Sequence, residues 1–187
     1  MSVVALAGSP SACSRSTALL RHVLARLDDD VVRTEIVLRD LPPAALVRAD
    51  FDDAAIQRAR EQVAAARVVV VATPIYKASF SGLLKSFLDL LPQDALRGKA
   101  VLALGTGGSA AHFLALDYAL KPVLAALGAR HILDSVYAVD AQFVPHAVHG
   151  HVAHDDVTQR IERALAAAPL ALRAAASSPA RPVALVA

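Results

Sequence analysis

The sequence has little sulfur, few aromatic residues and no long apolar run. It contains one cysteine, Cys13, no tryptophan, five phenylalanines and three tyrosines. A lone cysteine excludes an intramolecular disulfide and a cysteine-rich zinc module. The first twelve residues carry no basic segment, and no window reaches the roughly 18 uncharged apolar residues of a membrane span. We therefore expect a soluble cytoplasmic protein.

The sequence also lacks an excess of charge of either sign. Its 19 basic and 17 acidic residues give a net charge of +2, and they are scattered rather than clustered with aromatic residues. Nucleic acid and membrane are therefore not expected partners. What the chain has is aliphatic character, since 56% of its residues are hydrophobic and 41 are alanine. A chain of 187 residues is long enough for one domain that buries roughly 70% of its unfolded surface without a structural metal.

Short apolar runs alternate with longer stretches of helical periodicity. Residues 3–7 and 68–72 are apolar throughout, as in strands buried on both faces. Further strands are expected at residues 33–38, 100–104 and 132–139, and helices at 17–27, 54–66, 83–91, 110–127 and 157–168. Such alternation predicts parallel strands joined by helical crossovers. Five strands and five helices favour a flavodoxin-like α/β three-layer sandwich, with a five-stranded parallel sheet in the order 2-1-3-4-5 and helices on both faces.

The composition changes near the end of the chain. From Pro169 onward the residues are mostly alanine, proline and serine without a packed periodicity. We expect one flavodoxin-like domain over residues 1–168 and an Ala/Pro-rich low-complexity tail over residues 169–187.

The first predicted loop, residues 8–17, joins a buried strand to a helix. It carries one guanidinium, Arg15, beside the hydroxyls of Ser9, Ser14, Ser16 and Thr17. Hydroxyls and free amides at a helix start suit a phosphate. A polar turn in which Ser14 or Ser16 caps the helix explains the same residues, so both interpretations stay open. The spacing matches neither a Walker A loop nor a dinucleotide fingerprint. Cys13 lies within the loop rather than directly after the strand, which argues against a nucleophile of the phosphatase type.

Two further loops are expected at the same sheet edge. Residues 73–82 include Tyr76 and Phe80 and lead into a helix, and Pro74 favours an extended backbone that presents its amides. Residues 105–109 are rich in glycine, which lets a ligand approach the main chain closely. Ordinary turns would explain each loop separately. Ligands of open α/β sheets bind beyond the carboxyl ends of the strands, so three such loops together predict a binding site there.

Several motifs resemble the NADPH-dependent FMN reductase family. They are Gly8-Ser9-Pro10 with Ser14-Arg15-Ser16, then residues 72–77, 81–85 and 88–92. Residues 106–112 and 116–124 narrow the similarity to the flavin reductase components of two-component alkanesulfonate monooxygenase systems. The resemblance covers about residues 3–168. It implies a flavodoxin-like homo-oligomer, a dimer or tetramer, that reduces FMN with NADPH and passes the reduced flavin to a separate monooxygenase.

The resemblance also implies site residues. The FMN phosphate would be held by Ser9, Ser14, Arg15, Ser16 and Thr17. The isoalloxazine would be bordered on one side by Pro74, Ile75, Tyr76 and Lys77, and on the other by Thr106, Gly107, Gly108 and Ser109. Many relatives carry arginine directly after the Gly-Ser-Pro turn, where this chain has Ser11. Hydride transfer between nicotinamide and flavin needs no protein acid or base, so no catalytic side chain is assigned.

Pro122 lies deep within the expected helix at residues 110–127. A proline there removes the N–H that would bond the carbonyl of Tyr118, which predicts a kink or a π-bulge near Tyr118. In the family that the chain resembles, this region is associated with a π-helix at the subunit interface, which implies a role for Tyr118 in the oligomer interface and in flavin transfer. An ordinary core position is the alternative for Tyr118.

Four histidines, at positions 146, 149, 151 and 154, follow the last expected strand. They share no periodicity and no cysteine accompanies them, so we expect a mobile loop near the site or an interface rather than a metal site.

Two other functions fit the same fold. One is a quinone, azo or chromate reductase with tightly bound FMN, and the other is an electron carrier that binds flavin without nicotinamide turnover. A chain without tryptophan, with only Tyr76 near the expected ring position, lacks a heavy aromatic sandwich. An open flavin face favours a flavin that enters and leaves as a substrate.

Overall fold

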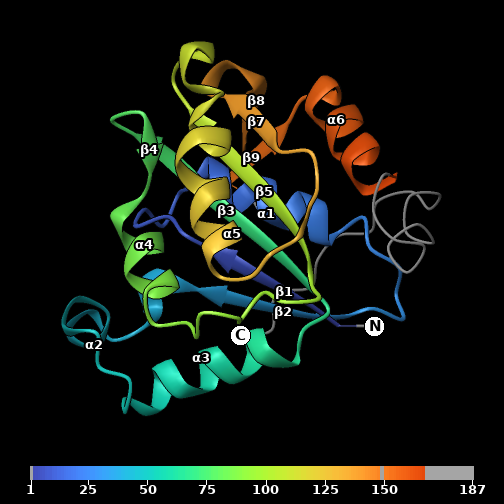
Figure 1. Ribbon diagram of the computed structural model, residues 1–187. Helices are drawn as coiled ribbons and strands as arrows, with labels where there is room; N and C mark the ends of the chain where they lie inside the picture. Colours follow the sequence, from blue (N-terminus) through green and yellow to red (C-terminus); the bar gives the residue numbers. More distant parts are fainter. Residues whose placement is uncertain (1, 148–149, 167–187) are drawn as a thin grey trace.

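The computed structural model describes residues 2–147 and 150–166, and its centre is a parallel β-sheet (Figure 1). The strand order is β2 (Val32–Val37), β1 (Ser2–Ala7), β3 (Val68–Tyr76), β5 (Ala100–Gly107) and β6 (His131–Ile132), and β7 (Val136–Val139) also pairs with β5. This confirms the expected flavodoxin-like order. The fifth expected strand is present as two pieces, β6 and β7.

The break between β6 and β7 accommodates one extra residue. Val101 of β5 pairs with Ile132, whereas Leu104, three residues later, pairs with Val136, four residues later. Because side chains alternate between the two faces of a strand, a shift of one residue exchanges the faces for everything that follows. Tyr137 consequently points into the same hydrophobic cluster as Ile132, while Val136 lies on the opposite face.

The apolar strands have two buried faces, each covered by its own helices. Val4 and Leu6 of β1 pack with α3 (Ala54–Ala65), α4 (Gly82–Leu88) and α5 (Lys121–Ala126). Val3 and Ala5 face the other way, toward α1 (Arg15–Leu24) and α6 (Asp155–Ala166). Figure 1 shows the sheet between these layers. The continuous apolar runs predicted this double burial, because a strand with one exposed face alternates with polar residues.

Local signals explain where the helices begin and end. Side chains of Ser14, Asp53 and Ser81 accept hydrogen bonds from backbone N–H groups and cap α1, α3 and α4. α4 stops at Leu88 rather than at residue 91, and Pro92 disfavours a helical conformation at residue 91 itself. The short helix α2 (Pro43–Arg48), which the sequence pattern did not predict, begins with proline at its first position.

The helix expected over residues 110–127 is not continuous. It consists of a 3₁₀ turn η2 (Ala110–His112), a π-helix η3 (Leu116–Leu120) and α5. The N–H of Lys121 bonds the carbonyl of Leu116, five residues earlier, as in a π-helix. The predicted π-bulge at Tyr118 is therefore confirmed, whereas one unbroken helix from residue 110 was wrong. Pro122 follows the π-turn directly, because it cannot donate the bond that an α-helix would require there.

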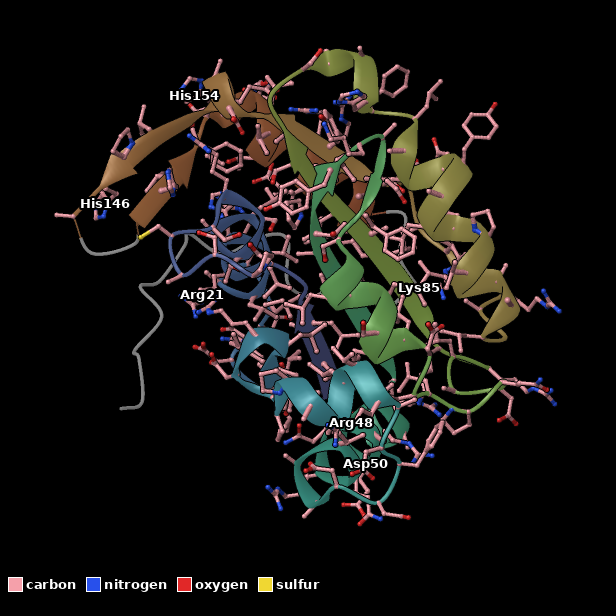
Figure 2. All side chains as sticks on the ribbon, turned by 90° about the vertical axis from the view of Figure 1, so that its left-hand side faces the viewer. Arg21, Arg48, Asp50, Lys85, His146 and His154 are labelled. Atoms are coloured by element: carbon pink, nitrogen blue, oxygen red, sulfur yellow. The ribbon has the colours of Figure 1, made fainter. Side chains whose placement is uncertain are left out.

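Two hairpins lie where the sequence predicted loops. β3 continues through Tyr76 and pairs with β4 (Ser79–Phe80), and β8 (Phe143–His146) pairs with β9 (Gly150–Ala153). The second hairpin holds His146 and His151 on its strands, and His154 follows it; His149 lies outside the described residues. Figure 2 shows His146 and His154 well apart along this hairpin. Within residues 2–147 and 150–166, no group of three His, Cys, Asp or Glu is placed to hold a metal.

Helices α1 and α6 are joined by side-chain contacts behind the sheet. His22 is hydrogen-bonded to Thr158 at 2.8 Å, and Arg26 lies 3.9 Å from Glu162. Burial, together with the nearby charge of Arg26, lowers the pKa of His22 to about 4, so this imidazole is neutral at neutral pH. No helix in the described part of the chain has the length and apolar character to cross a membrane. The expected tail, residues 169–187, falls outside the described residues.

Candidate functional site

Three loops that follow β1, β3 and β5 meet at the carboxyl edge of the sheet, as predicted. Ser81, at the start of α4, joins the first two. Its hydroxyl donates to the carbonyl of Gly8 and accepts from the N–H of Leu84. The N–H of Gly8 donates to the carbonyl of Ala72 at 2.8 Å, and a Cβ at position 8 would lie only 2.9 Å from that oxygen. Gly8 is therefore required for this close approach.

The first loop wraps the N-terminus of α1 with hydroxyls. Ser14 caps the helix by accepting from the N–H of Thr17 at 3.2 Å, and its hydroxyl lies 2.9 Å from that of Ser16. Ser9 is buried and accepts from the N–H of Ser11. The question of which serine caps the helix is thus answered by Ser14. A capping serine and a phosphate site are compatible, because a cap uses only one of the free N–H groups of the first turn.

Two buried polar atoms of this loop lack a partner. Among the described residues, the hydroxyl of Thr17 and Nε of Arg15 make no hydrogen bond. Buried polar atoms are almost always paired, and an exception calls for an explanation. A hydroxyl and a guanidinium N–H at the positive end of a helix fit an anion with several acceptor oxygens. The residues present therefore fit a phosphate group.

The second loop is a tight hairpin rather than an open loop. Lys77 and Ala78 form its turn with φ of 49° and 60°, a left-handed conformation that favours glycine or asparagine. Thr73 is buried and donates to the carbonyl of Pro74 while accepting from the N–H of Ser81. Tyr76 is half exposed beside the turn, whereas the side chain of Ile75 is buried in the core. Ile75 can therefore meet a ligand only through its main chain.

The third loop is held by a tyrosine. The hydroxyl of Tyr137 on β7 donates to the carbonyl of Ser109 at 2.7 Å. A Cβ on Gly107 would lie 2.4 Å from that hydroxyl oxygen, so glycine is needed there. Thr106 is buried at the end of β5, in register with Pro74 of β3, so the second and third loops leave the sheet side by side. Burial raises the pKa of Tyr137, and the negative charge of Asp140 raises it further.

Sequence reasoning missed three residues at this edge. Tyr137 holds the third loop, and Asp140 lies 3.5 Å from Arg15. Arg39, in the 3₁₀ turn η1 (Leu38–Asp40) that follows β2, donates to the carbonyl of Ser11 at 3.0 Å. Arg39 therefore brings a second guanidinium to the first loop. It comes from a distant part of the chain and not from position 11, directly after Gly-Ser-Pro, where this chain has Ser11. The sequence indicated Asp140 only weakly, as an acidic residue directly after the last apolar run.

Tyr118 is strongly exposed rather than a core residue. Its side chain is 78% exposed, and Phe113 and Leu114 nearby in the sequence are 54% and 43% exposed. The alternative of an ordinary core position is thus excluded. Three exposed apolar side chains within six residues favour an interaction surface.

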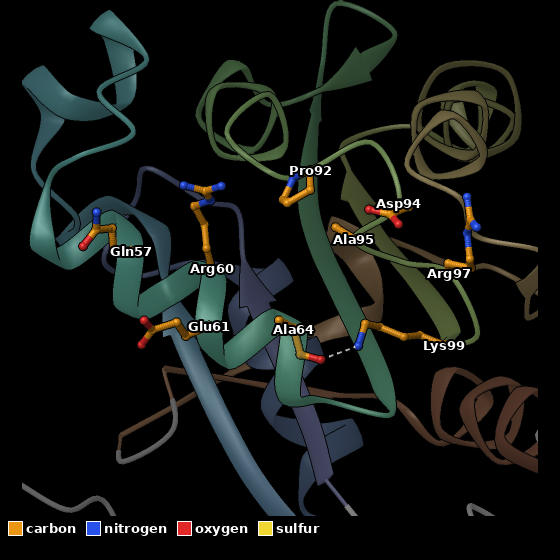
Figure 3. Close-up of a pocket in the computed structure, with 9 residues that line it drawn as sticks. All are labelled: Gln57, Arg60, Glu61, Ala64, Pro92, Asp94, Ala95, Arg97 and Lys99. Atoms are coloured by element: carbon orange, nitrogen blue, oxygen red, sulfur yellow. Dashed lines mark hydrogen bonds between the residues drawn. The ribbon is translucent and has the colours of Figure 1, made fainter.

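A separate groove lies between α3 and the segment before β5 (Figure 3). Lys99 crosses one end of it and donates to the carbonyl of Ala64 at 2.7 Å, the bond drawn in Figure 3, and to that of Ala66 at 2.6 Å. These residues stand at the amino ends of β3 and β5, whereas the three loops follow the carboxyl ends. The groove is therefore not part of the candidate site.

The chain is similar to known flavin reductases over most of its length. The model of a family described as NADPH-dependent FMN reductase matches residues 1–144. An FMN reductase (NADPH) of Escherichia coli (strain K12) is 50% identical over 145 residues, 77% of this chain and 76% of the relative. An NADH-dependent FMN reductase, SfnE, of Pseudomonas putida is 36% identical over 154 residues, 79% of this chain and 82% of the relative.

A solved structure agrees with these sequence matches. The apo form of an NADH:FMN oxidoreductase has a TM-score of 0.79 and 45% identity, covering 87% of this chain and 85% of that one. The chain belongs to the NADPH-dependent FMN reductase family, and it is an oxidoreductase whose cofactors are FMN and a reduced nicotinamide.

Proposed function

We propose that this protein reduces FMN as a dissociable substrate and supplies reduced FMN to a partner monooxygenase, in the use of alkanesulfonates or related organosulfur compounds. The observation that carries the proposal is a pair of buried polar atoms at the N-terminus of α1, the hydroxyl of Thr17 and Nε of Arg15, neither of which has a hydrogen-bond partner in the described part of the chain. Free donors at a helix start suit the phosphate group of FMN. The absence of tryptophan, with only Tyr76 near the expected ring position, supports a flavin that enters and leaves. The similarity of residues 106–124 to two-component reductases supports the partner.

In this proposal the first loop holds the FMN phosphate. The donors are Ser9, Ser14, Arg15, Ser16 and Thr17 with the free N–H groups of the helix start. Pro74–Lys77 border the flavin ring on one side and Thr106–Ser109 on the other, with Tyr137 fixing the second border through Ser109. Bound FMN supplies the redox chemistry, as the acceptor of a hydride from the nicotinamide. Lys77 and main-chain amides near the ring would stabilise negative charge on the reduced flavin.

The proposal is tested with the purified full chain, FMN, NADPH and NADH. We expect protein that is nearly colourless after dialysis and that oxidises NADPH or NADH in proportion to added FMN, measured by absorbance of the nicotinamide. Yellow protein that reduces quinones or azo dyes without added FMN would instead identify a reductase with tightly bound flavin. FMN binding without nicotinamide oxidation would identify an electron carrier.

We further propose that Tyr118, with Phe113 and Leu114, forms an interface between copies of this chain and takes part in flavin transfer. Three apolar side chains exposed by 43% to 78% lie next to and within the π-helix, and β4 of the flavin-bordering hairpin packs against that π-helix. A subunit seated there would cover them and would touch the hairpin that borders the flavin ring. Apolar burial would then stabilise the assembly.

Replacing Tyr118 by aspartate is expected to shift the protein to smaller species, because a carboxylate in an apolar interface is desolvated without a partner. Sedimentation velocity at several concentrations measures the shift. Val47→Asp is the matched control, since Val47 is 81% exposed on α2, away from this surface. Equal sedimentation of Tyr118→Asp and the parent protein at all concentrations would refute the interface.

A further inference from the structure

Asp140 stands between the first and third loops. It follows β7 directly, and its Oδ2 lies 3.5 Å from Nη1 of Arg15 and 3.9 Å from the position that a Cβ on Gly108 would take. Asp40, the acidic group on the other side of the first loop, is paired with Arg39 at 3.6 Å and is more exposed than Asp140, at 68% against 45%. Asp140 is therefore the carboxylate set most directly among the loops.

The contact between Asp140 and Arg15 is an ion pair and not a close hydrogen bond. Charge-assisted N–H···O bonds span about 2.7–2.9 Å, whereas this separation is 3.5 Å. Arg15 keeps Nε buried and without a hydrogen bond in the described structure. The guanidinium thus lies within the field of Asp140 while donors remain free for another anion. Its pairing is not strong enough to make Asp140 a rigid support for Arg15.

The negative charge of Asp140 acts within the site. It contributes, after burial, to the raised pKa of Tyr137, whose hydroxyl holds Ser109. A phosphate dianion at the N-terminus of α1 would be exposed to the same field, and like charges at short range are unfavourable.

We propose that Asp140 is an affinity-setting residue, which weakens binding of the FMN phosphate by repelling it and by sharing the guanidinium of Arg15. This inference rests on the proposed phosphate site. It assigns a structural cause to the release of flavin, since a site with hydroxyls, a helix N-terminus and two nearby guanidiniums would otherwise retain a dianion tightly. Riboflavin, which has the same ring but no phosphate, does not meet this repulsion.

The test compares FMN with riboflavin in Asp140→Asn. The amide keeps the shape and removes the charge, so we expect the FMN dissociation constant to fall by about three- to tenfold, while that of riboflavin stays within about twofold. Flavin fluorescence quenching measures both constants, and stopped-flow dilution should show slower FMN release. Glu162→Gln is the matched control, because it removes one negative charge from the α1–α6 contact with Arg26 and should leave both constants unchanged.

Three results would overturn the inference and leave the proposed phosphate site standing. Weaker FMN binding in Asp140→Asn would show that Asp140 supports Arg15. An equal fall in the dissociation constants of FMN and riboflavin would show that Asp140 acts on the flavin ring and not on the phosphate. The same tightening in Glu162→Gln would reduce the effect to net charge. A parent protein that binds FMN no better than riboflavin would contradict the phosphate site itself and the inference with it, which separates that failure from the other three.

Discussion

Gly107→Ala is expected to lower the free energy of unfolding by about 1–3 kcal/mol and to abolish most FMN reduction. The new methyl group would lie 2.4 Å from the hydroxyl oxygen of Tyr137, far inside van der Waals contact. Tyr137 is 8% exposed and hydrogen-bonded to Ser109, so it has little room to move. Relief of the clash would displace the third loop, which borders the proposed flavin position. Chemical denaturation and steady-state NADPH oxidation measure the two effects.

Two further variants identify the cause of that loss. Tyr137→Phe removes the clashing oxygen and leaves Cζ 3.4 Å from the added methyl, an ordinary contact. Tyr137→Phe alone should lower the free energy of unfolding by about 1 kcal/mol, because the hydrogen bond to Ser109 is lost. The double variant of Tyr137→Phe and Gly107→Ala should nevertheless be more stable than Gly107→Ala alone. Gly82→Ala is the control, because a Cβ there meets nothing within 4 Å. Additive losses in the double variant would show that the clash with Tyr137 is not the cause.

Arg15→Gln is expected to weaken FMN binding by about 10- to 100-fold, the loss of one charge-assisted contact to a phosphate. Riboflavin binding should be unchanged, because Arg15 belongs to the first loop and not to the ring borders. Isothermal titration with each flavin measures the difference. The direction is opposite to that expected for Asp140→Asn, although the two side chains form one ion pair at 3.5 Å.

Arg21→Gln is the matched control for Arg15→Gln. Arg21 lies on the same helix but pairs with Glu35 of β2 through two hydrogen bonds of 3.0 and 3.1 Å, remote from the helix N-terminus. Its loss should lower stability and leave both flavin affinities intact. A parallel loss of FMN and riboflavin affinity in Arg15→Gln would show that the arginine supports the loop as a whole and does not bind phosphate.

The layers and strand order could be predicted because they depend on patterns within short segments. Residues 3–7 and 68–72 would be apolar on both faces of a strand. A strand needs two apolar faces only when helices cover both sides of its sheet. The π-turn at Tyr118 was predictable for a similar reason, since Pro122 cannot donate a helical hydrogen bond wherever the helix packs. The meeting of three loops followed from topology, as the carboxyl ends of parallel strands share one edge.

The hairpins were missed because their signals are weak in the sequence. In the β3–β4 turn, Lys77 and Ala78 adopt a left-handed conformation, whereas asparagine and glycine are the residues typical of such turns. The β8–β9 hairpin contains Pro145, which argues against a strand, and its histidines suggested a loop. Tertiary contacts stabilise both hairpins, since β4 packs against the π-helix and β9 against α1.

The sequence alone determined the fold class, the sheet edge that carries the candidate site and the hydroxyls of the first loop, since these depend on local hydrophobicity and chain order. Only the tertiary structure decided which other side chains lie at the candidate site. The extra residue between β6 and β7 exchanges the faces of the last strand and directs Tyr137 toward Ser109, and the end of that strand carries Asp140 to Arg15. A register shift changes no residue type, so its effect becomes visible only when the strands are paired.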